Sequence, residues 1–359
     1  MYAACEMFGL GANDEVLTPA FDCDGTLQPF RVLGYKLQFF RSNPYDFTVD
    51  IEDIKRKINR KTKLLHIINH FGMPQPWNEL LKLRQESGIP ILEDNAYSLF
   101  SEFDRKPFGT FGDASVFSLR KNLPLIDGGM LRINNPRYSL KLSDKKIPWL
   151  YPTEIKTLLY LAKDNLELNG FFKTIIYIVK GFGFFKELLP PLYSDEKSGY
   201  PIYPLRDAIG REFSCDYLRP MSGLAKRQLS EFLQEDYIEI YNKKRYFYSY
   251  LMKEIGQIKG INILWPVLPE GIIPFCLSLL IAQRRDIFLK VLRKKYSVMA
   301  WPALSNLVLE RLENFPEVEL LGRKLLQINL PANKVRHPGF SKYLQNLLLD
   351  IYKLSQKYL

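Results

Sequence analysis

Short apolar runs alternate with amphipathic stretches through the first third of the chain, and this alternation restricts the fold more than any other feature. The apolar runs lie at residues 36–40, 63–69, 89–94 and 114–117, with helical periodicity at 50–58 and 76–87. Fully buried parallel strands read as continuous apolar runs. Strands that alternate with helices form parallel sheets with right-handed crossovers. The sequence therefore predicts an α/β domain.

The length of the chain predicts two domains. It has 359 residues, of which 47% are hydrophobic and 25% charged, which is ordinary for a soluble globular protein. We expect a large domain at 1–215, in which 136–215 is an irregular, partly helical insertion, and a smaller C-terminal α/β domain at 216–359. The segment 171–189 is rich in aromatic residues but carries three lysines, so we predict no transmembrane segment. A buried helix pair or dimer contact is our preferred interpretation of it, and an amphipathic membrane-surface helix is the alternative.

The charge and the cysteines narrow the classes of partner. The net charge is +11, but the basic residues are spread along the chain and do not form one recognition helix, so we predict no nucleic-acid partner. Attraction to an anionic small molecule is compatible with this charge. The four cysteines lack metal-binding spacing and form no cluster with the three histidines. We therefore expect a reduced, cytoplasmic protein without a structural metal.

Two residues at predicted strand ends suggest a cofactor. Lys121 follows the apolar run 114–117, and Asp94 ends the run 89–94. Ligands bind at the carboxyl edge of parallel sheets, and a lysine there is either a surface charge or a nucleophile that forms a Schiff base. A carboxylate at the end of a buried strand needs a cationic partner. Pyridoxal 5′-phosphate enzymes use this pair, a lysine for the aldehyde and a carboxylate for the pyridine nitrogen.

The motifs around these residues resemble the DegT/DnrJ/StrS-type nucleotide-sugar aminotransferase family of fold-type-I pyridoxal phosphate enzymes. Their order and most of their spacings agree with the family pattern. The matching segments are Leu92–Ala96 (LEDNA), Gly109–Asp113 (GTFGD), Phe117-Ser118, Lys121-Asn122, Gly128-Gly129 and, in the second domain, Leu326–Pro331. The resemblance implies a three-layer large domain with a mostly parallel sheet and a smaller C-terminal α/β domain.

The resemblance also implies roles for individual residues. Lys121 would be the catalytic lysine, Asp94 the partner of the pyridine nitrogen, and Ser118 a phosphate ligand. Tyr97 stands where the family has Gln or His near the ring oxygen. Arg120 is our own addition, because its guanidinium fork could also bind the phosphate. With less support, His70 matches an HxxG-like turn, and Arg219 lies near the expected subunit interface.

The chain departs from the family pattern at several positions. The Ser-Gly-Thr turn that holds the cofactor phosphate is absent, so we expect a truncated N-terminus. Only Leu119-Arg120 separates Ser118 from Lys121, and no asparagine stands near Asp216. Cys23 lies near the position where many members stack an aromatic ring on the cofactor.

The sequence thus predicts a pyridoxal phosphate-dependent transaminase of a nucleotide-linked keto sugar, in cell-surface polysaccharide or amino-sugar biosynthesis. Glutamate as amino donor and a homodimer follow from the resemblance alone. The lysine argues against the family's dehydratase branch. The alternatives are a diverged or truncated member without activity and a nucleic-acid or membrane-surface binder.

Overall fold

A computed structural model describes most of the chain. The described residues are 1–140, 147–149, 220–234, 237–300, 304–331, 335 and 337–359, together with the backbone of the antiparallel pair β9 (Tyr193–Ser194) and β10 (Pro201–Ile202). The segment 171–189 and Arg219 lie outside these residues, as does most of the predicted insertion at 136–215.

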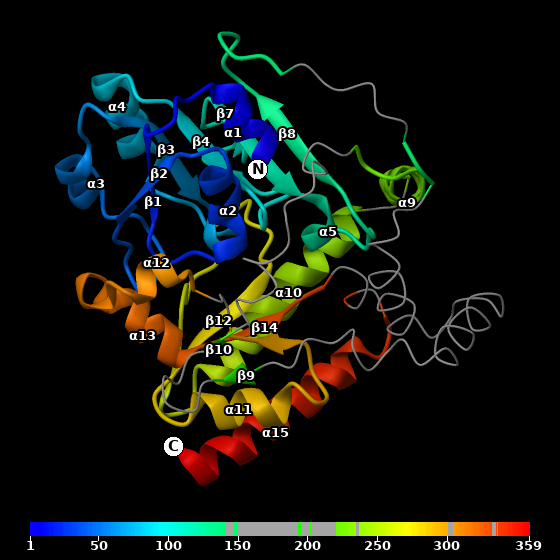
Figure 1. Cartoon of the computed structure of the whole chain (residues 1–359). Helices are drawn as coiled ribbons and strands as arrows, with labels where there is room; N and C mark the ends of the chain where they lie inside the picture. The colour runs from blue at the N-terminus through cyan, green and yellow to red at the C-terminus, as the bar shows by residue number, and fades with distance from the viewer. Residues whose placement is uncertain are drawn as a thin grey trace, which may run out of the picture.

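The first domain is built on a six-stranded sheet in the order β2-β1-β3-β4-β7-β8 (Figure 1). All neighbouring strands are parallel except the edge strand β8, which pairs antiparallel with β7. The predicted α/β domain with a mostly parallel sheet is therefore confirmed. The strands are β1 (Glu15–Pro19), β2 (Lys36–Phe40), β3 (Thr62–Ile68), β4 (Ile91–Asp94), β7 (Ala114–Ser118) and β8 (Gly129–Ile133).

Helices cover both faces of this sheet. Successive side chains of a strand point to opposite faces, and here both faces carry apolar side chains that must be buried. Val16 and Leu64 pack in one core cluster with α1 (Tyr2–Phe8) and α2 (Asp24–Val32). Their neighbours Leu17 and Leu65 pack in another cluster with α3 (Ile51–Lys57) and α4 (Trp77–Ser87). The result is a three-layer domain.

Local signals in the sequence explain where the helices begin and end. Asp50 caps α3 by accepting a hydrogen bond from the backbone N–H of Asp53 at 2.9 Å. Gly88 ends α4 in the left-handed conformation, with φ of 71°. These two predicted helices are confirmed. The sequence analysis missed α2, because Pro29 lies inside it.

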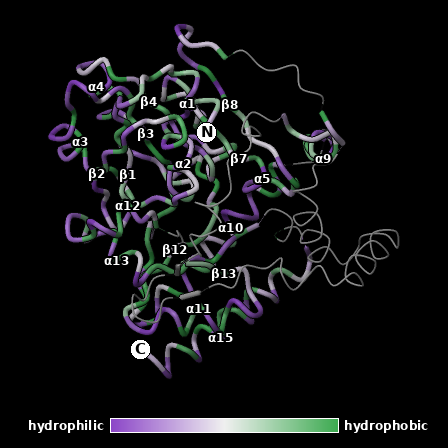
Figure 2. Tube along the Cα trace, in the orientation of Figure 1, coloured by the Kyte–Doolittle hydropathy of each residue, from purple (hydrophilic) through white to green (hydrophobic). Residues whose placement is uncertain are grey.

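The second domain contains a four-stranded sheet in the order β11-β12-β14-β13, and all its pairs are antiparallel. Two helices, α9 (Gly223–Leu233) and α10 (Tyr237–Ile255), precede this sheet in the chain. Figure 2 shows hydrophobic and hydrophilic residues alternating along the terminal helix α15. The elements are α9 (Gly223–Leu233), α10 (Tyr237–Ile255), β11 (Ile261–Ile263), β12 (Cys276–Ile281), α11 (Arg285–Leu292), β13 (Val298–Met299), α12 (Asn306–Leu309), α13 (Pro316–Lys324), β14 (Leu325–Asn329) and α15 (Phe340–Tyr358).

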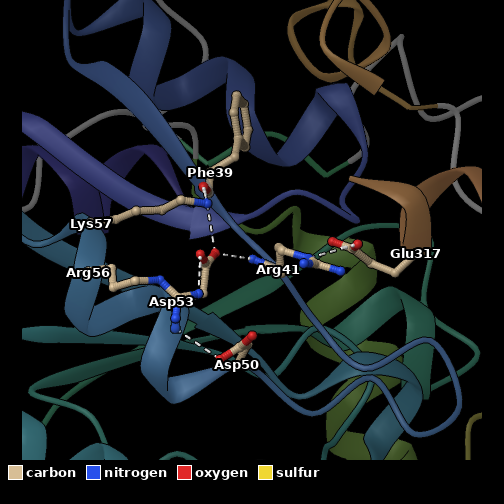
Figure 3. Close-up of polar contacts among 7 residues, drawn as sticks. All are labelled: Phe39, Arg41, Asp50, Asp53, Arg56, Lys57 and Glu317. Atoms are coloured by element: carbon tan, nitrogen blue, oxygen red, sulfur yellow. Dashed lines mark hydrogen bonds and ion pairs between the residues drawn. The ribbon is translucent and has the colours of Figure 1, made fainter. Parts of the chain in front are cut away.

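Polar contacts join the two domains beside β2. Arg41 follows β2, and its Nε donates to Glu317 of α13 at 3.2 Å, while its backbone N–H donates to Asp53 (Figure 3). Lys57 also donates to Asp53, at 2.7 Å. Further along the boundary, Ser305 donates to Asp24 at 2.8 Å. The second domain is thus held close to the carboxyl ends of the large sheet.

Candidate functional site

The predicted lysine and aspartate come from neighbouring strand ends. Strand β4 ends at Asp94, which pairs in register with Val116 of β7. Strand β7 is followed by a single helical turn, α5 (Leu119–Asn122), which carries Lys121. The side-chain amide of Asn122 donates to the carbonyl of Ala96 at 2.9 Å and to that of Ser118 at 2.8 Å. Asn122 therefore clamps the lysine turn onto the loop that follows Asp94.

Lys121 is half-buried beside an aromatic ring. Its Nζ lies 4.0 Å from the centroid of the Tyr97 ring, and Tyr97 is itself buried. Burial lowers the pKa of Lys121, while Asp94, Cys23 and Asp22 act in the opposite direction without cancelling the effect. A lysine in such surroundings gives up its proton more readily than a surface lysine, which is what a nucleophile or a base needs.

Asp94 is a buried carboxylate. It is 5% exposed, and its Oδ1 accepts a hydrogen bond from the backbone N–H of Ala96 at 2.8 Å. Its Oδ2 lies 3.6 Å from Nε2 of His66. Burial by itself raises the pKa of Asp94, but His66, Lys121 and the Ala96 N–H together outweigh it and the pKa is lowered. Asp94 is therefore ionised near neutral pH.

Asp22 is a second acid that the sequence analysis missed. It is 1% exposed, and its Oδ1 accepts the backbone N–H of Cys23 at 2.6 Å. Burial, and then the charge of Asp94, raise its pKa well above the usual value, and Lys121 acts on it in the opposite direction. The site thus pairs an ionised carboxylate with a carboxyl group that retains its proton to higher pH. Asp22 comes shortly after β1, which ends at Pro19, and this place at a strand end was the available signal.

The other acids of the matching motifs hold the loops in place. Glu93 is fully buried and accepts the backbone N–H groups of Gly109, Phe111 and Gly112 at 2.7 to 3.1 Å. Asp113 accepts two hydrogen bonds from the guanidinium of Arg84, at 2.7 and 2.5 Å. Glu93 therefore compensates for its burial with backbone N–H donors.

The remaining predicted residues are not all gathered at this site. Ser118 is half-buried at the start of α5 and makes no capping hydrogen bond there, and Arg120 is exposed. His70 is 1% exposed, with Nε2 2.9 Å from the carbonyl of Phe21 inside an aromatic cluster. Burial lowers the pKa of His70 to about 4, and burial raises that of the Cys23 thiol to about 11. Arg219 is outside the described residues.

The residues present fit pyridoxal phosphate. Asp94 is an ionised, buried carboxylate, and Lys121 has a lowered pKa and interacts electrostatically with it. The side chain of Ser118 is not engaged in capping the helix that carries the lysine. Within the described part of the chain, no group of three or more His, Cys, Asp or Glu side chains could hold a metal ion. In the same part, no helix is long and apolar enough to cross a membrane.

Comparison with known proteins identifies relatives of the first domain. Residues 1–143 match the model of the DegT/DnrJ/EryC1/StrS aminotransferase family. The GDP-perosamine synthase of Vibrio cholerae is 31% identical over 137 residues, which are 38% of this chain and 37% of that protein. The GDP-perosamine synthase of Escherichia coli O157:H7 is 27% identical over 137 residues, 38% of each chain. The match thus spans less than two-fifths of these curated relatives.

Solved structures share the fold along almost the whole chain. PseC of Helicobacter pylori, an aminotransferase involved in pseudoaminic acid biosynthesis, has a TM-score of 0.64 and 16% identity, covering 99% of this chain and 84% of that one. The E. coli GDP-4-keto-6-deoxy-D-mannose-3-dehydratase, solved with hydrated pyridoxal phosphate, has a TM-score of 0.60 and 16% identity, covering 97% and 83%. These structures confirm the predicted fold, and the match of residues 1–143 to the family model confirms the predicted resemblance for that part of the chain.

Proposed function

We propose that this chain, whose residues 1–143 match the model of the DegT/DnrJ/EryC1/StrS aminotransferase family, is a pyridoxal phosphate-dependent aminotransferase of a nucleotide-linked keto sugar. The observation that carries the proposal is that Lys121 and Asp94 follow neighbouring strand ends and interact electrostatically, while Asn122 joins the two loops that carry them. The curated relatives named GDP-perosamine synthase support a nucleotide-sugar substrate. A role in cell-surface polysaccharide or amino-sugar biosynthesis fits this substrate class.

Four residues would hold the cofactor. Lys121 would bind its aldehyde, Asp94 its pyridine nitrogen, and Ser118 its phosphate, with Tyr97 beside the ring. When bound, pyridoxal phosphate supplies an electron sink for the carbon that carries the transferred amino group. Arg120 is exposed next to Ser118 and could add a charged contact to the phosphate.

Lys121 carries the proton-transfer step in this proposal. Once its amine is free, Nζ would act as the base that moves a proton between the carbon bearing the amino group and the bound cofactor, in one direction with the amino donor and in the other with the acceptor. A base works best when its pKa lies near the working pH, and burial lowers the pKa of Lys121 in that direction. The Tyr97 ring stays close to the amine, 4.0 Å from Nζ, and limits where the amine can move.

Asp94 sets the charge of the site. Because its pKa is lowered, its carboxylate keeps a proton on any basic nitrogen that binds opposite it. Asp22 has a raised pKa and can donate a hydrogen bond from its carboxyl group at the same time. The two acids therefore offer an acceptor and a donor to one ligand.

The wider setting is part of the same proposal. We infer that glutamate is the amino donor, that the protein works as a homodimer, and that it acts in the cytoplasm. The amino donor and the homodimer rest on the family resemblance, and the cytoplasmic location rests on the cysteine pattern. Size-exclusion chromatography with light scattering tests the dimer, and an amino-donor screen tests glutamate.

Cofactor binding tests the proposal directly. Purified protein incubated with pyridoxal phosphate and then dialysed is expected to keep a visible absorbance band from the lysine-linked cofactor. Lys121→Ala should lose the band, and Asp94→Asn should keep bound cofactor with greatly reduced activity. Lys244→Met is the matched control, since Lys244 is another buried lysine, whose pKa burial lowers to about 8.

Two outcomes would contradict the proposal. Wild-type protein that stays colourless would favour a family member without catalytic activity. A band that survives in Lys121→Ala and disappears in Lys244→Met would place the reactive amine at a different site.

A further inference from the structure

Three polar side chains, which end in Asp94, form a row across neighbouring strands of the large sheet. Thr18 on β1, His66 on β3 and Asp94 on β4 occupy three adjacent strands. Thr18 and His66 are fully buried, and Asp94 is nearly so. They lie on the face packed by α1 and α2, because each is an even number of residues from Val16, Leu64 or Leu92 in that core cluster. Buried polar groups on an otherwise apolar face require a reason.

The ring of His66 lies between Thr18 and Asp94. Oγ1 of Thr18 lies 2.8 Å from Nδ1 of His66, within hydrogen-bond distance. On the other side of the ring, Nε2 lies 3.6 Å from Oδ2 of Asp94. Nε2 has no hydrogen-bond partner in the described part of the chain. The carboxylate of Asp94 is therefore the acceptor that Nε2 faces.

Electrostatics assigns the hydrogens. A bare Nε2 lone pair facing a carboxylate would be repelled, so Nε2 carries a proton. In the neutral ring Nδ1 is then an acceptor, and the hydroxyl of Thr18 donates to it. The separation of 3.6 Å is too long for a hydrogen bond, but a shift of roughly half an ångström would close it.

We propose that Thr18 and His66 are positioning residues, which orient the carboxylate of Asp94 and hold it ionised toward the ligand site. The proposal rests on the function proposed above. His66 is fully buried, so in this proposal it acts on the ligand site through Asp94. A side chain that contacts a ligand-binding group from behind fixes the orientation and basicity of that group.

The first test uses the protein without cofactor. The chain has only three histidines, so [15N]histidine NMR gives a simple spectrum, and His66→Gln assigns the signals of His66. We expect the tautomer with the proton on Nε2. A proton on Nδ1 alone would contradict the proposal, because Thr18 could not then donate to that nitrogen.

The second test uses the cofactor-loaded protein. A positive charge on the pyridine nitrogen disfavours a second positive charge on the lysine-linked nitrogen. If the interaction of Asp94 with the pyridine nitrogen becomes weaker, the lysine-linked nitrogen should keep its proton to higher pH. The pH midpoint at which the visible absorbance band changes should therefore rise. We expect His66→Leu to raise this midpoint by about half a unit and to lower kcat about tenfold with little change in KM, the scale of a lost hydrogen bond to a charged group. Thr18→Val should shift it in the same direction, and His66→Gln should restore part of the loss.

A control separates this role from simple destabilisation. Val16→Ala lies on the same strand and face as Thr18, and it should lower stability without moving the midpoint. If His66→Leu retains the wild-type midpoint and kcat, the proposal is wrong while the aminotransferase function stands. If wild-type protein binds no pyridoxal phosphate, the proposed aminotransferase function is wrong, and the positioning role of Thr18 and His66 is wrong as well.

Discussion

At the scale of single residues, the environment gives chemically similar groups different states. Asp22 and Asp94 are both buried, but the pKa of Asp22 is raised and that of Asp94 is lowered. The difference arises because His66, Lys121 and a backbone N–H stabilise the charge of Asp94, whereas burial and the charge of Asp94 dominate at Asp22. Divergent pKa values of neighbouring acids are typical of sites that bind or transfer protons.

His70 makes stability depend on pH. Burial lowers its pKa to about 4, so the native state binds fewer protons than the unfolded chain below pH 6.5. Stability from this group is complete above that pH and is lost as the pH falls toward 4. At pH 5 the loss from His70 is about 2 kcal/mol. The pKa values of Asp22, Glu93 and Glu317 are raised, which gives the opposite slope, so the measurement must isolate His70.

Urea unfolding of wild type and His70→Gln, each at pH 7.5 and pH 5, isolates the contribution of His70 to the free energy of unfolding. The variant keeps a side-chain donor for the carbonyl of Phe21 but has no titrating ring. We expect wild type to lose more unfolding free energy than the variant between the two pH values. Equal losses would show that the ring of His70 titrates normally in the folded protein.

At the scale of elements, two buried acids, Glu93 and Asp113, hold the loop 109–113 in its conformation. Glu93 binds three N–H groups of this loop, and Asp113 joins its end to Arg84 of α4. Gly112 has no room for a side chain, since a Cβ would lie 2.8 Å from the carbonyl oxygen of Ile91. These contacts fix the start of β7, and through it the position of Lys121.

Asp113→Ala should therefore destabilise the large domain. Removing the carboxylate leaves Arg84 without its partner and also removes the acceptor for the backbone N–H of Ile91. We expect a loss of about 3 kcal/mol in unfolding free energy, measured by denaturant titration. Lys82→Ala on the exposed side of the same helix is the control, because its pair with Glu86 is solvent-exposed and should contribute little. Similar losses in the two variants would rule out a structural role specific to Asp113.

The sequence predicted most elements of the large domain but only part of its site. Strands β3, β4 and β7 were visible as apolar runs, and Lys121 and Asp94 as their polar ends. Thr18 and His66 were hidden, because a continuous apolar strand gives no sign of which residues share a face. Counting in twos from Asp94 along β4, and pairing strands in register, would have placed His66 on its face, but the register requires the structure.

At the scale of the whole molecule, the second domain lies against the loops at the carboxyl ends of the large sheet. The backbone N–H of Ile273 donates to Ser101, and that of Glu102 donates to Gly271. Arg41 and Glu317 form a further link (Figure 3). The antiparallel order of the second sheet could not be predicted, because alternation of strands and helices does not specify strand direction. The predicted division at 215–216 stays a prediction.

Borohydride reduction of the protein loaded with pyridoxal phosphate, followed by peptide mapping with mass spectrometry, tests the central claim most directly. Reduction makes the link between cofactor and lysine permanent, so the labelled peptide identifies the reactive amine. We predict a single pyridoxyl label, on Lys121. A label on Lys244, or no stable label on any lysine, would contradict the account.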